Sequence, residues 1–361
     1  MKIFVVGAPP QRSASSQSHF AYGLRSWDAF AWEALTTLKR RCFSKKPQGA
    51  LPLDPAKGHS PLDSRLKYFW ECLYKVFFVL FLLVGFPLIV FAKDANTLVA
   101  AGKGEAYDLI EAAGFGYEVP DNSREHKQNP VRHIKQVYDN DLKTYVFAFQ
   151  IHALIDDDRG IKSVTDRQRV EIKTYDKSPA SMTAKEGETL LMRWKMRLSL
   201  GFKVTNKFCH LHQLKGTDNR KGTADVKHPL ITLTACEKKN GSKQFELRYF
   251  NRKNRKMTVV KSANLEEFLG NWVEITEKVT FGVNKPQNHN GSYSIKITRL
   301  KDNKEILSYS SDELDLWQTD SPLLRPKWGI YRSLGENRSL ENMLRDEEIR
   351  FNEFYIEKCK F

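Results

Sequence analysis

The chain has 361 residues, of which 41% are hydrophobic and 12% aromatic, and it carries a net charge of +15. This length allows one large folded domain or two small ones, and the positive charge favours an anionic partner. The five cysteines have irregular spacing, which predicts neither a disulfide framework nor a zinc site. No zinc-finger, helix-turn-helix or RNA-binding motif is present, so nucleic acid is not the expected partner.

The N-terminal part of the chain has a composition unlike the rest. Residues 1–66 are rich in Ser, Pro, Lys and Arg and are expected to be disordered, as a cytoplasmic tail or as an over-extended gene model. Residues 76–92 form an uncharged, mostly apolar run, which predicts a signal peptide or signal-anchor helix within 67–92, with a buried core helix as the alternative. The preceding basic residues keep that end cytoplasmic. The protein is therefore expected to be secreted or type II membrane-anchored, with membrane contact only through 76–92.

After an expected linker over 93–114, the pattern changes to short strands, and 115–361 are expected to form one domain. Several runs alternate apolar and polar residues or are rich in β-branched and aromatic residues. These runs are 145–149, 190–198, 230–234, 245–249, 272–276, 293–297 and 351–356. Asn240-Gly241 and Asn290-Gly291 predict hairpin turns, and 264–269 is one short helix candidate. Many short strands with little helix predict an all-β fold, a single β-sandwich of the jelly-roll type.

Three segments place polar, titratable residues at every second position: Arg167-Gln-Arg-Val-Glu171, His210-Leu-His212 and Lys327-Trp-Gly-Ile-Tyr331. Residues i, i+2 and i+4 of a β-strand share one face. The pattern therefore predicts three strands with one polar face and one core face. Their guanidinium, imidazole, ammonium and phenol groups together favour chemistry on an anionic substrate in a concave groove.

In this order, the three segments resemble those of the jelly-roll polysaccharide lyases, most closely heparin lyase I-like and glucuronan lyase-like proteins, over residues 115–361. The resemblance implies β-elimination at a uronic acid of an anionic polysaccharide, by a monomer without a cofactor. This reaction needs a neutralised substrate carboxylate, a base for the C5 proton and an acid for the O4 leaving group.

The resemblance also implies a role for each polar residue of the three segments. Tyr331 would be the acid, and also a candidate base, with its pKa lowered by nearby Arg or Lys charge. His212 would be the base or a partner of the substrate carboxylate. Arg169 and Lys327 would bind or neutralise that carboxylate.

Six further residues are expected to contact substrate or support these groups: His210, Gln213, Arg167, Glu171, Lys215 and Arg332. His210 stands where many relatives have glutamine. Regular alternation places Gln213 with the core, unless a bulge turns it inward. Glu171 is expected to hold the guanidinium of Arg169.

Some features keep two interpretations. Gln150-Ile-His152 spells the family's triplet, but it precedes Arg167, so chain order favours His210-Leu-His212. Asp156-Asp-Asp158 is either a structural calcium site or an acidic loop. Cys209 and Cys236 form either a disulfide or two buried thiols.

Two other functions compete with the lyase. A non-catalytic carbohydrate-binding jelly roll keeps the sheet and its basic face but needs no proton transfer. A glycoside hydrolase needs two facing carboxylates. Glu313-Leu-Asp315 lacks a third carboxylate at the spacing of a known hydrolase motif, which disfavours that alternative.

Overall fold

The computed structural model describes residues 96–359, except 124, 125, 127–129, 162, 283, 286, 287 and 290. The segments 1–66 and 67–92, with the apolar run 76–92, lie outside these residues. Within the described part, no helix is both long and apolar enough to cross a membrane.

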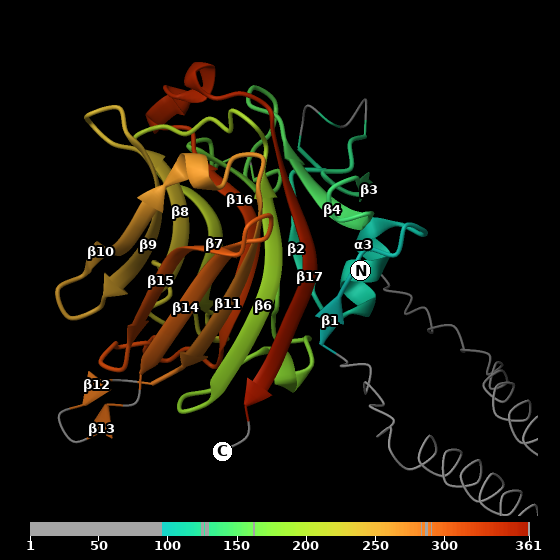
Figure 1. The fold of residues 1–361 in the computed structure, drawn as a ribbon. Coiled ribbons are helices and arrows are strands. Elements are labelled where there is room, and N and C mark those ends of the chain that lie inside the picture. Colours follow the sequence, from blue (N-terminus) through green and yellow to red (C-terminus); the bar gives the residue numbers. More distant parts are fainter. Residues whose placement is uncertain are drawn as a thin grey trace, which may run out of the picture. The chain divides into compact units, whose positions relative to one another are not determined.

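Two antiparallel sheets form a β-sandwich of the jelly-roll type, which confirms the predicted fold class (Figure 1). The eight-stranded sheet contains, from one edge, β15 (Lys304–Ser311), β14 (Ser292–Arg299), β11 (Trp272–Thr280), β6 (Thr189–Leu198), β17 (Glu347–Cys359), β4 (Thr144–Ile151) and β3 (Ile134–Asp139), while β1 (Thr97–Leu98) pairs with β17. The seven-stranded sheet contains β10 (Lys256–Asn264), β9 (Lys243–Asn251), β8 (Ile231–Glu237), β7 (Cys209–Gly216), β16 (Leu324–Ser333), β5 (Arg167–Lys173) and β2 (Gly116–Glu118).

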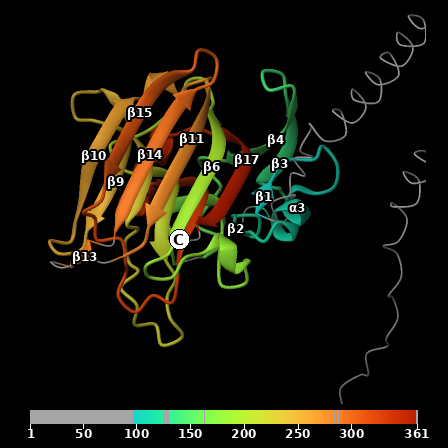
Figure 2. The same cartoon turned by 60° about the horizontal axis from the view of Figure 1, so that its bottom comes forward.

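The remaining elements are short. They are the helix α3 (Ala106–Ala112), the 3-10 helices at Ala180–Met182, Leu265–Glu267, Glu336–Arg338 and Glu341–Met343, and a small pair of strands, β12 (Asn284–Lys285) and β13 (Asn288–His289). Figure 2 shows the two layers of the sandwich from another side, with α3 and β1 close together beside β17.

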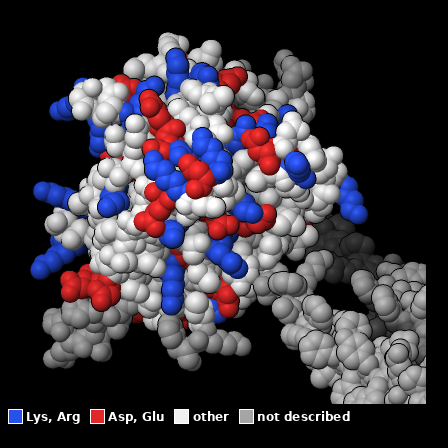
Figure 3. Space-filling view, viewed as in Figure 1, with Lys and Arg blue, Asp and Glu red and all other residues white. Residues whose placement is uncertain are grey.

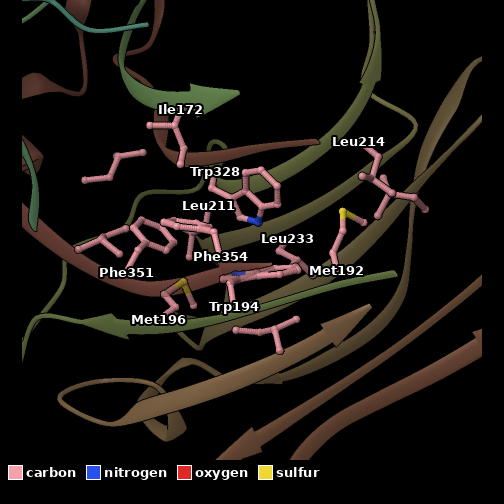
Figure 4. Packing of buried hydrophobic residues seen from close by; sticks show 14 of the residues in the cluster. Ile172, Met192, Trp194, Met196, Leu211, Leu214, Leu233, Trp328, Phe351 and Phe354 are labelled. Carbon is pink, nitrogen blue, oxygen red and sulfur yellow. The ribbon is translucent and has the colours of Figure 1, made fainter. Parts of the chain in front are cut away.

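The core lies between the two sheets because their strands alternate apolar and polar residues. On β6, Met192, Trp194 and Met196 are buried, while the intervening Arg193 and Lys195 are not. The seven-stranded sheet contributes Trp328, whose ring centre lies 5.7 Å from that of Trp194. Figure 4 shows these tryptophans among other buried hydrophobic side chains, both aliphatic and aromatic.

The predicted strands agree with observed ones, while the predicted short helix and the predicted linker differ from what the structure shows. Each predicted strand lies on an observed strand, and Asn240-Gly241 connects β8 to β9; Asn290 lies outside the described residues. The predicted helix at 264–269 is a 3-10 turn, where Asn264 accepts a hydrogen bond from the Glu266 amide at 3.1 Å. The expected linker holds β1 and α3, and α3 buries Ile110 in the core.

Candidate functional site

The three polar segments lie on adjacent strands, because β16 pairs with β5 on one side and with β7 on the other. Tyr331 of β16 stands opposite both Arg169 and His210. Lys327, two positions before Gly329, stands opposite Gln213. We call the side of this sheet that faces away from the core the polar face.

Two arginines of β5 contact Tyr331 from different directions. Arg167 Nη1 donates a hydrogen bond to the Tyr331 hydroxyl at 2.7 Å. The guanidinium of Arg169 lies 3.9 Å from the centre of the Tyr331 ring. The phenol is thus held at its oxygen by one cation and across its ring face by another.

Arg169 is bound by three carboxylates. Its Nε donates to Asp158 at 2.8 Å, and its Nη1 donates to Glu118 at 2.7 Å and to Glu171 at 3.1 Å. Burial opposes the charged guanidinium, but Glu171, Glu118 and Asp158 raise the pKa of Arg169. Glu171 therefore contacts Arg169 as the sequence predicts, and two further acids help to fix the guanidinium.

Lys327 lies between two of the same carboxylates. Its Nζ is 2.5 Å from Glu118 and 2.7 Å from Glu171. Lys173 also donates to Glu118, at 2.7 Å. Burial opposes ionisation of Glu118, but Lys327, Arg169 and Lys173 hold the pKa of its carboxyl well below the ordinary value.

Glu118 is a central residue of this network that the sequence does not reveal. It lies on β2, a strand of only three residues, which is too short to show alternation. Asp158, the other acid that binds Arg169 from outside the three segments, lies in the triplet for which the sequence predicts either a calcium site or an acidic loop.

A bulge changes which side chains of β7 reach the polar face. The pairing of β7 with β8 shifts register between His210 and His212, and that of β7 with β16 shifts between Trp328 and Tyr331. The prediction that His210 and His212 share one face is therefore wrong. The bulge places His210 and Gln213 on the polar face, and Gln213 Nε2 donates to Glu171.

His212 instead lies between the sheets. Its side chain is 1% exposed, and its ring centre is 4.7 Å from that of Trp194 and 5.2 Å from that of Trp328. Its Nε2 lies 3.0 Å from Glu277 of β11, in the opposite sheet, without hydrogen-bond geometry. The residue expected to be a base is thus part of the core and does not reach the polar face.

His210 is held in its neutral form on the polar face. Its Nδ1 lies 2.7 Å from the Thr234 hydroxyl, and its ring stacks on Phe208 at 4.6 Å between centres. Burial, with the nearby charges of Arg248 and Arg169, lowers the pKa of His210 to about 3. The imidazole is therefore uncharged at neutral pH, 5.9 Å from the Tyr331 ring between centres.

The pKa of Tyr331 differs from the expectation. Burial raises the pKa of Tyr331 above its ordinary value, although Arg169 and Arg167 act in the opposite direction. The expected lowering does not occur because loss of hydration outweighs the neighbouring positive charge. Tyr331 therefore stays protonated at neutral pH and is suited to be a proton donor.

Lys215 and Arg325 are cations of the polar face without an acidic partner. They stand opposite each other on β7 and β16. Among the described residues, no carboxylate lies within ion-pair distance of either side chain, and Arg325 Nε and Nη1 are buried without a hydrogen-bond partner. Burial, together with Lys327 and Arg169, lowers the pKa of Lys215 to about 8.

Arg332 does not lie with the other predicted substrate-binding residues. It follows Tyr331 directly, so its side chain is on the core side of β16. It is 1% exposed, and its Nε donates to Gln168 at 2.9 Å. Expecting it beside the substrate was wrong because adjacent residues of a strand face opposite ways.

The three carboxylates Asp156, Asp157 and Asp158 have separate partners. Asp157 accepts from the Gly160 amide at 2.6 Å, Asp158 binds Arg169, and Asp156 contacts histidine side chains. They do not form one set of oxygen ligands, and bound calcium stays a prediction.

Other predicted alternatives have clear positions. Gln150 lies on β4 of the eight-stranded sheet, and His152 comes directly after that strand. Neither residue lies on a strand of the polar face. Cys209 and Cys236 are buried free thiols.

The face of the molecule drawn in Figure 3 carries positive and negative side chains intermixed. On the outer side of the eight-stranded sheet, Arg197 and Arg350 both bind Asp139, and Lys195 binds Glu353. Their charges are locally balanced, in contrast to those of Lys215 and Arg325.

No known protein family matches the sequence, and no curated protein matches it. Solved structures with a similar fold include the marine PL-14 alginate lyase from Aplysia kurodai, with 12% identity and a TM-score of 0.46 over 73% of this chain and 98% of that one. Alginate lyase A1-II' has 15% identity and a TM-score of 0.45, over 72% and 99% of the two chains. Alginate lyase PA1167 from Pseudomonas aeruginosa has 13% identity and a TM-score of 0.40, over 68% and 98%. Similarities this low assign neither a substrate nor an activity to this chain.

Proposed function

We propose that this chain is a polysaccharide lyase that cleaves a uronic-acid polymer by β-elimination. The observation that carries the proposal is the pairing of a protonated phenol, Tyr331, with a neutral imidazole, His210, on one polar face rich in cations. An acid and a base on the same face are what the elimination requires.

In the proposed reaction, His210 takes the C5 proton. If its Nδ1 carries a hydrogen and donates to Thr234, then Nε2 keeps a lone pair for this step. The C5 electron pair forms the C4–C5 double bond as the bond from C4 to the leaving oxygen breaks, and Tyr331 donates its proton to that oxygen. His210 thus replaces His212 as the proposed base.

Neutralisation of the substrate carboxylate is the second requirement. Arg169 and Lys327, the residues expected to supply it, are already engaged by Glu118 and Glu171. Among the described residues of the polar face, Lys215 and Arg325 are cations for which no ion pair is found. We therefore assign carboxylate binding to Lys215 and Arg325, with Gln213 as a hydrogen-bond donor beside them.

The proposed substrate is an anionic polysaccharide, and the proposed location is outside the cell or in a lumen. The apolar run at residues 76–92 supports delivery across a membrane, by secretion or by a type II anchor. The proposed enzyme acts as a monomer without a catalytic cofactor.

The full chain should be incubated separately with glucuronan, heparin-type polymers and alginate. Each elimination creates an unsaturated uronate, which absorbs at about 235 nm, because proton abstraction next to a carboxylate leaves a conjugated double bond. A rise in absorbance with at least one polymer supports the proposal. No rise with any uronic-acid polymer, from protein that is folded, contradicts it.

A non-catalytic carbohydrate-binding protein is the second candidate. One observation favours it: Arg169 and Lys327 are each paired with Glu118, so their charges are not available to stabilise a reacting substrate group. Such a protein would bind the same polymers, and binding without any unsaturated product identifies it.

A further inference from the structure

Behind the polar face, three histidines and one aspartate gather their side chains at one point. They are His126, His133, His152 and Asp156, and one possible ligand atom from each lies within 4.8 Å of all the others. His126, His133 and Asp156 are buried, and the His152 side chain is 26% exposed. The polar-face machinery uses none of these four side chains.

The ring nitrogens point at the same carboxylate. His126 Nε2 lies 2.6 Å from Asp156 Oδ1, and His133 Nε2 lies 3.0 Å from the same oxygen. His152 Nδ1 lies 3.2 Å from the other oxygen, Oδ2. Ligands of a four-coordinate zinc ion, with bonds of about 2.0–2.1 Å, stand roughly 3.3 Å apart. The three nitrogen–oxygen distances are therefore near or just below this spacing, and the limit of 4.8 Å between all four donors allows them to close around one ion with small side-chain shifts.

His133 has the outer partner that is typical of a metal ligand. Its Nδ1 lies 2.6 Å from Asp121 Oδ1, and Asp121 also accepts a hydrogen bond from the Tyr107 hydroxyl at 3.1 Å. A carboxylate on the far nitrogen fixes the ring and leaves Nε2 free to bind a metal. Asp121 and Tyr107 have the geometry of this supporting shell.

The turn that carries two of the donors is held in place independently of them. Gln168 Nε2 donates to the carbonyl oxygens of His152, at 2.7 Å, and of Asp156, at 2.9 Å. Arg338 donates to the Asp156 carbonyl at 3.3 Å. The donors of this turn are therefore preorganised by the backbone.

The charges balance if a divalent cation is present. Asp156 and Asp121 contribute two negative charges to a site whose histidines are neutral when they bind metal. One divalent ion balances these two carboxylates, and the exposed Arg132, 3.4 Å from Asp121 Oδ2, adds a positive charge at the edge of the group. Imidazole donors with one carboxylate favour zinc and related transition metals over calcium, which prefers oxygen ligands.

We propose that His126, His133, His152 and Asp156 bind one zinc-class transition-metal ion as a closed structural site. The site differs from a calcium site in the Asp156–Asp158 triplet, because it uses one carboxylate and three imidazoles. No cysteine takes part in it, so the site is compatible with a cysteine spacing that predicts no zinc site. Asp158, two residues beyond Asp156, binds Arg169, so the ion would brace the segment that positions Arg169.

The test uses the untagged full chain, stripped with a chelator and then titrated with Zn²⁺ and separately with Co²⁺. The proposal predicts about one Zn²⁺ bound per chain, a higher Tm with Zn²⁺, and the strong visible absorption of four-coordinate Co²⁺. Ca²⁺ should give no comparable rise in Tm. No stoichiometric binding and no Tm rise with Zn²⁺ would overturn the proposal, and would leave the four residues as a hydrogen-bonded cluster only.

Variants then locate the ion. His126→Ala and His152→Ala should each weaken Zn²⁺ binding by more than about 100-fold, beyond the usual cost of losing an outer-shell partner. His228→Ala is the matched control, because His228 stacks on Phe250 elsewhere in the fold, and it should bind Zn²⁺ as the unaltered chain does. Equal binding by all three variants would place the ion elsewhere and overturn the assignment. Should a variant fail to fold, the titration of the unaltered chain still decides whether the metal binds.

Discussion

The guanidinium of Arg169 lies 3.9 Å from the centre of the Tyr331 ring and makes its hydrogen bonds to Asp158, Glu118 and Glu171. Arg169 therefore contacts the phenol only through its ring. A cation over an aromatic face is attracted by the ring itself. This contact orients Tyr331 and leaves its hydroxyl available to Arg167 and to a substrate.

Replacement of Tyr331 by Phe should greatly reduce turnover and keep the fold. The phenyl ring retains the contact with Arg169, while the proton donor is lost. General acid catalysis contributes about 10²–10⁴-fold, so kcat should fall by that factor while polymer binding changes little. The initial rate of unsaturated-product formation and a binding isotherm measure the two effects.

The control for this change is Tyr138→Phe. Tyr138 is 51% exposed on β3, in the other sheet, and its loss should leave kcat unaltered. If Tyr331→Phe keeps the full rate, Tyr331 is not the acid.

Lys215 should give the enzyme a basic pH limit. Its pKa of about 8 means that its positive charge is lost as the pH rises above that value. If only the charged form binds an anionic polymer, kcat/KM falls about tenfold per pH unit above the pKa. Lys215→Arg keeps its charge, so this fall in kcat/KM at basic pH should disappear. A profile of kcat/KM against pH from pH 6 to about pH 10 measures the difference. Identical profiles for the two proteins would exclude Lys215 as its source.

Glu118→Gln should destabilise the domain strongly. Glu118 contacts Arg169, Lys173 and Lys327, and the amide leaves these cations without their shared counter-charge. Breaking a buried ion pair from one side costs about 3–5 kcal/mol, which urea unfolding can measure. Glu266→Gln is the control, because no ion pair is found for Glu266 among the described residues. If Glu118→Gln lowers the free energy of unfolding no more than Glu266→Gln does, the ion-pair network contributes little to stability.

Gly329→Ala should disrupt the junction between β16 and its neighbours. Gly329 has φ of +148°, and a Cβ there would collide with the Val170 carbonyl oxygen and lie 2.7 Å from Glu171 Cα. The expected loss is at least about 3 kcal/mol of unfolding free energy, from steric overlap together with backbone strain.

Gly104→Ala separates these two causes. Gly104 also has a positive φ, of +71°, but an added Cβ meets no atom within 4 Å. It should lose only roughly 1–2 kcal/mol from the left-handed conformation. Equal losses at the two sites would mean that the collision is relieved by movement of β5.

His210→Gln should alter how stability depends on pH. The folded pKa is about 3 and the ordinary value is 6.5, so between these values the unfolded chain binds one more proton than the folded chain. The contribution of His210 is therefore present above pH 6.5 and is lost as the pH falls toward 3, by roughly 1.4 kcal/mol per pH unit. Glutamine does not titrate, so the difference between the unfolding curves of the two proteins should show this slope. A difference that is constant with pH would contradict the lowered pKa.

Alternation in the sequence predicted the polar face correctly for two of its three strands. On β5 and β16, strict alternation places Arg169 and Tyr331 opposite each other. On β7, one register shift exchanges the faces of His212 and Gln213. A bulge inserts a residue without requiring a particular residue type. The sequence therefore does not indicate whether His212 or Gln213 lies on the polar face.

Two other groups depend on contacts between distant segments. Glu118 reaches the site from a short edge strand, and its partners lie on other strands. His126, His133 and His152 lie outside any short metal-binding motif, because folding alone brings their segments together. Residue spacing could not reveal either arrangement.

The order of strands also determines when the polar face can be assembled. β16 is inserted between β7 and β5, and β17 is inserted between β6 and β4. Until residues 324–359 are synthesised, each sheet consists of two separate pieces with unpaired inner edges. Pairings over such long sequence separations form slowly, and exposed strand edges invite association with other chains. The nascent protein is therefore expected to need protection by chaperones until its last two strands have joined the sheets.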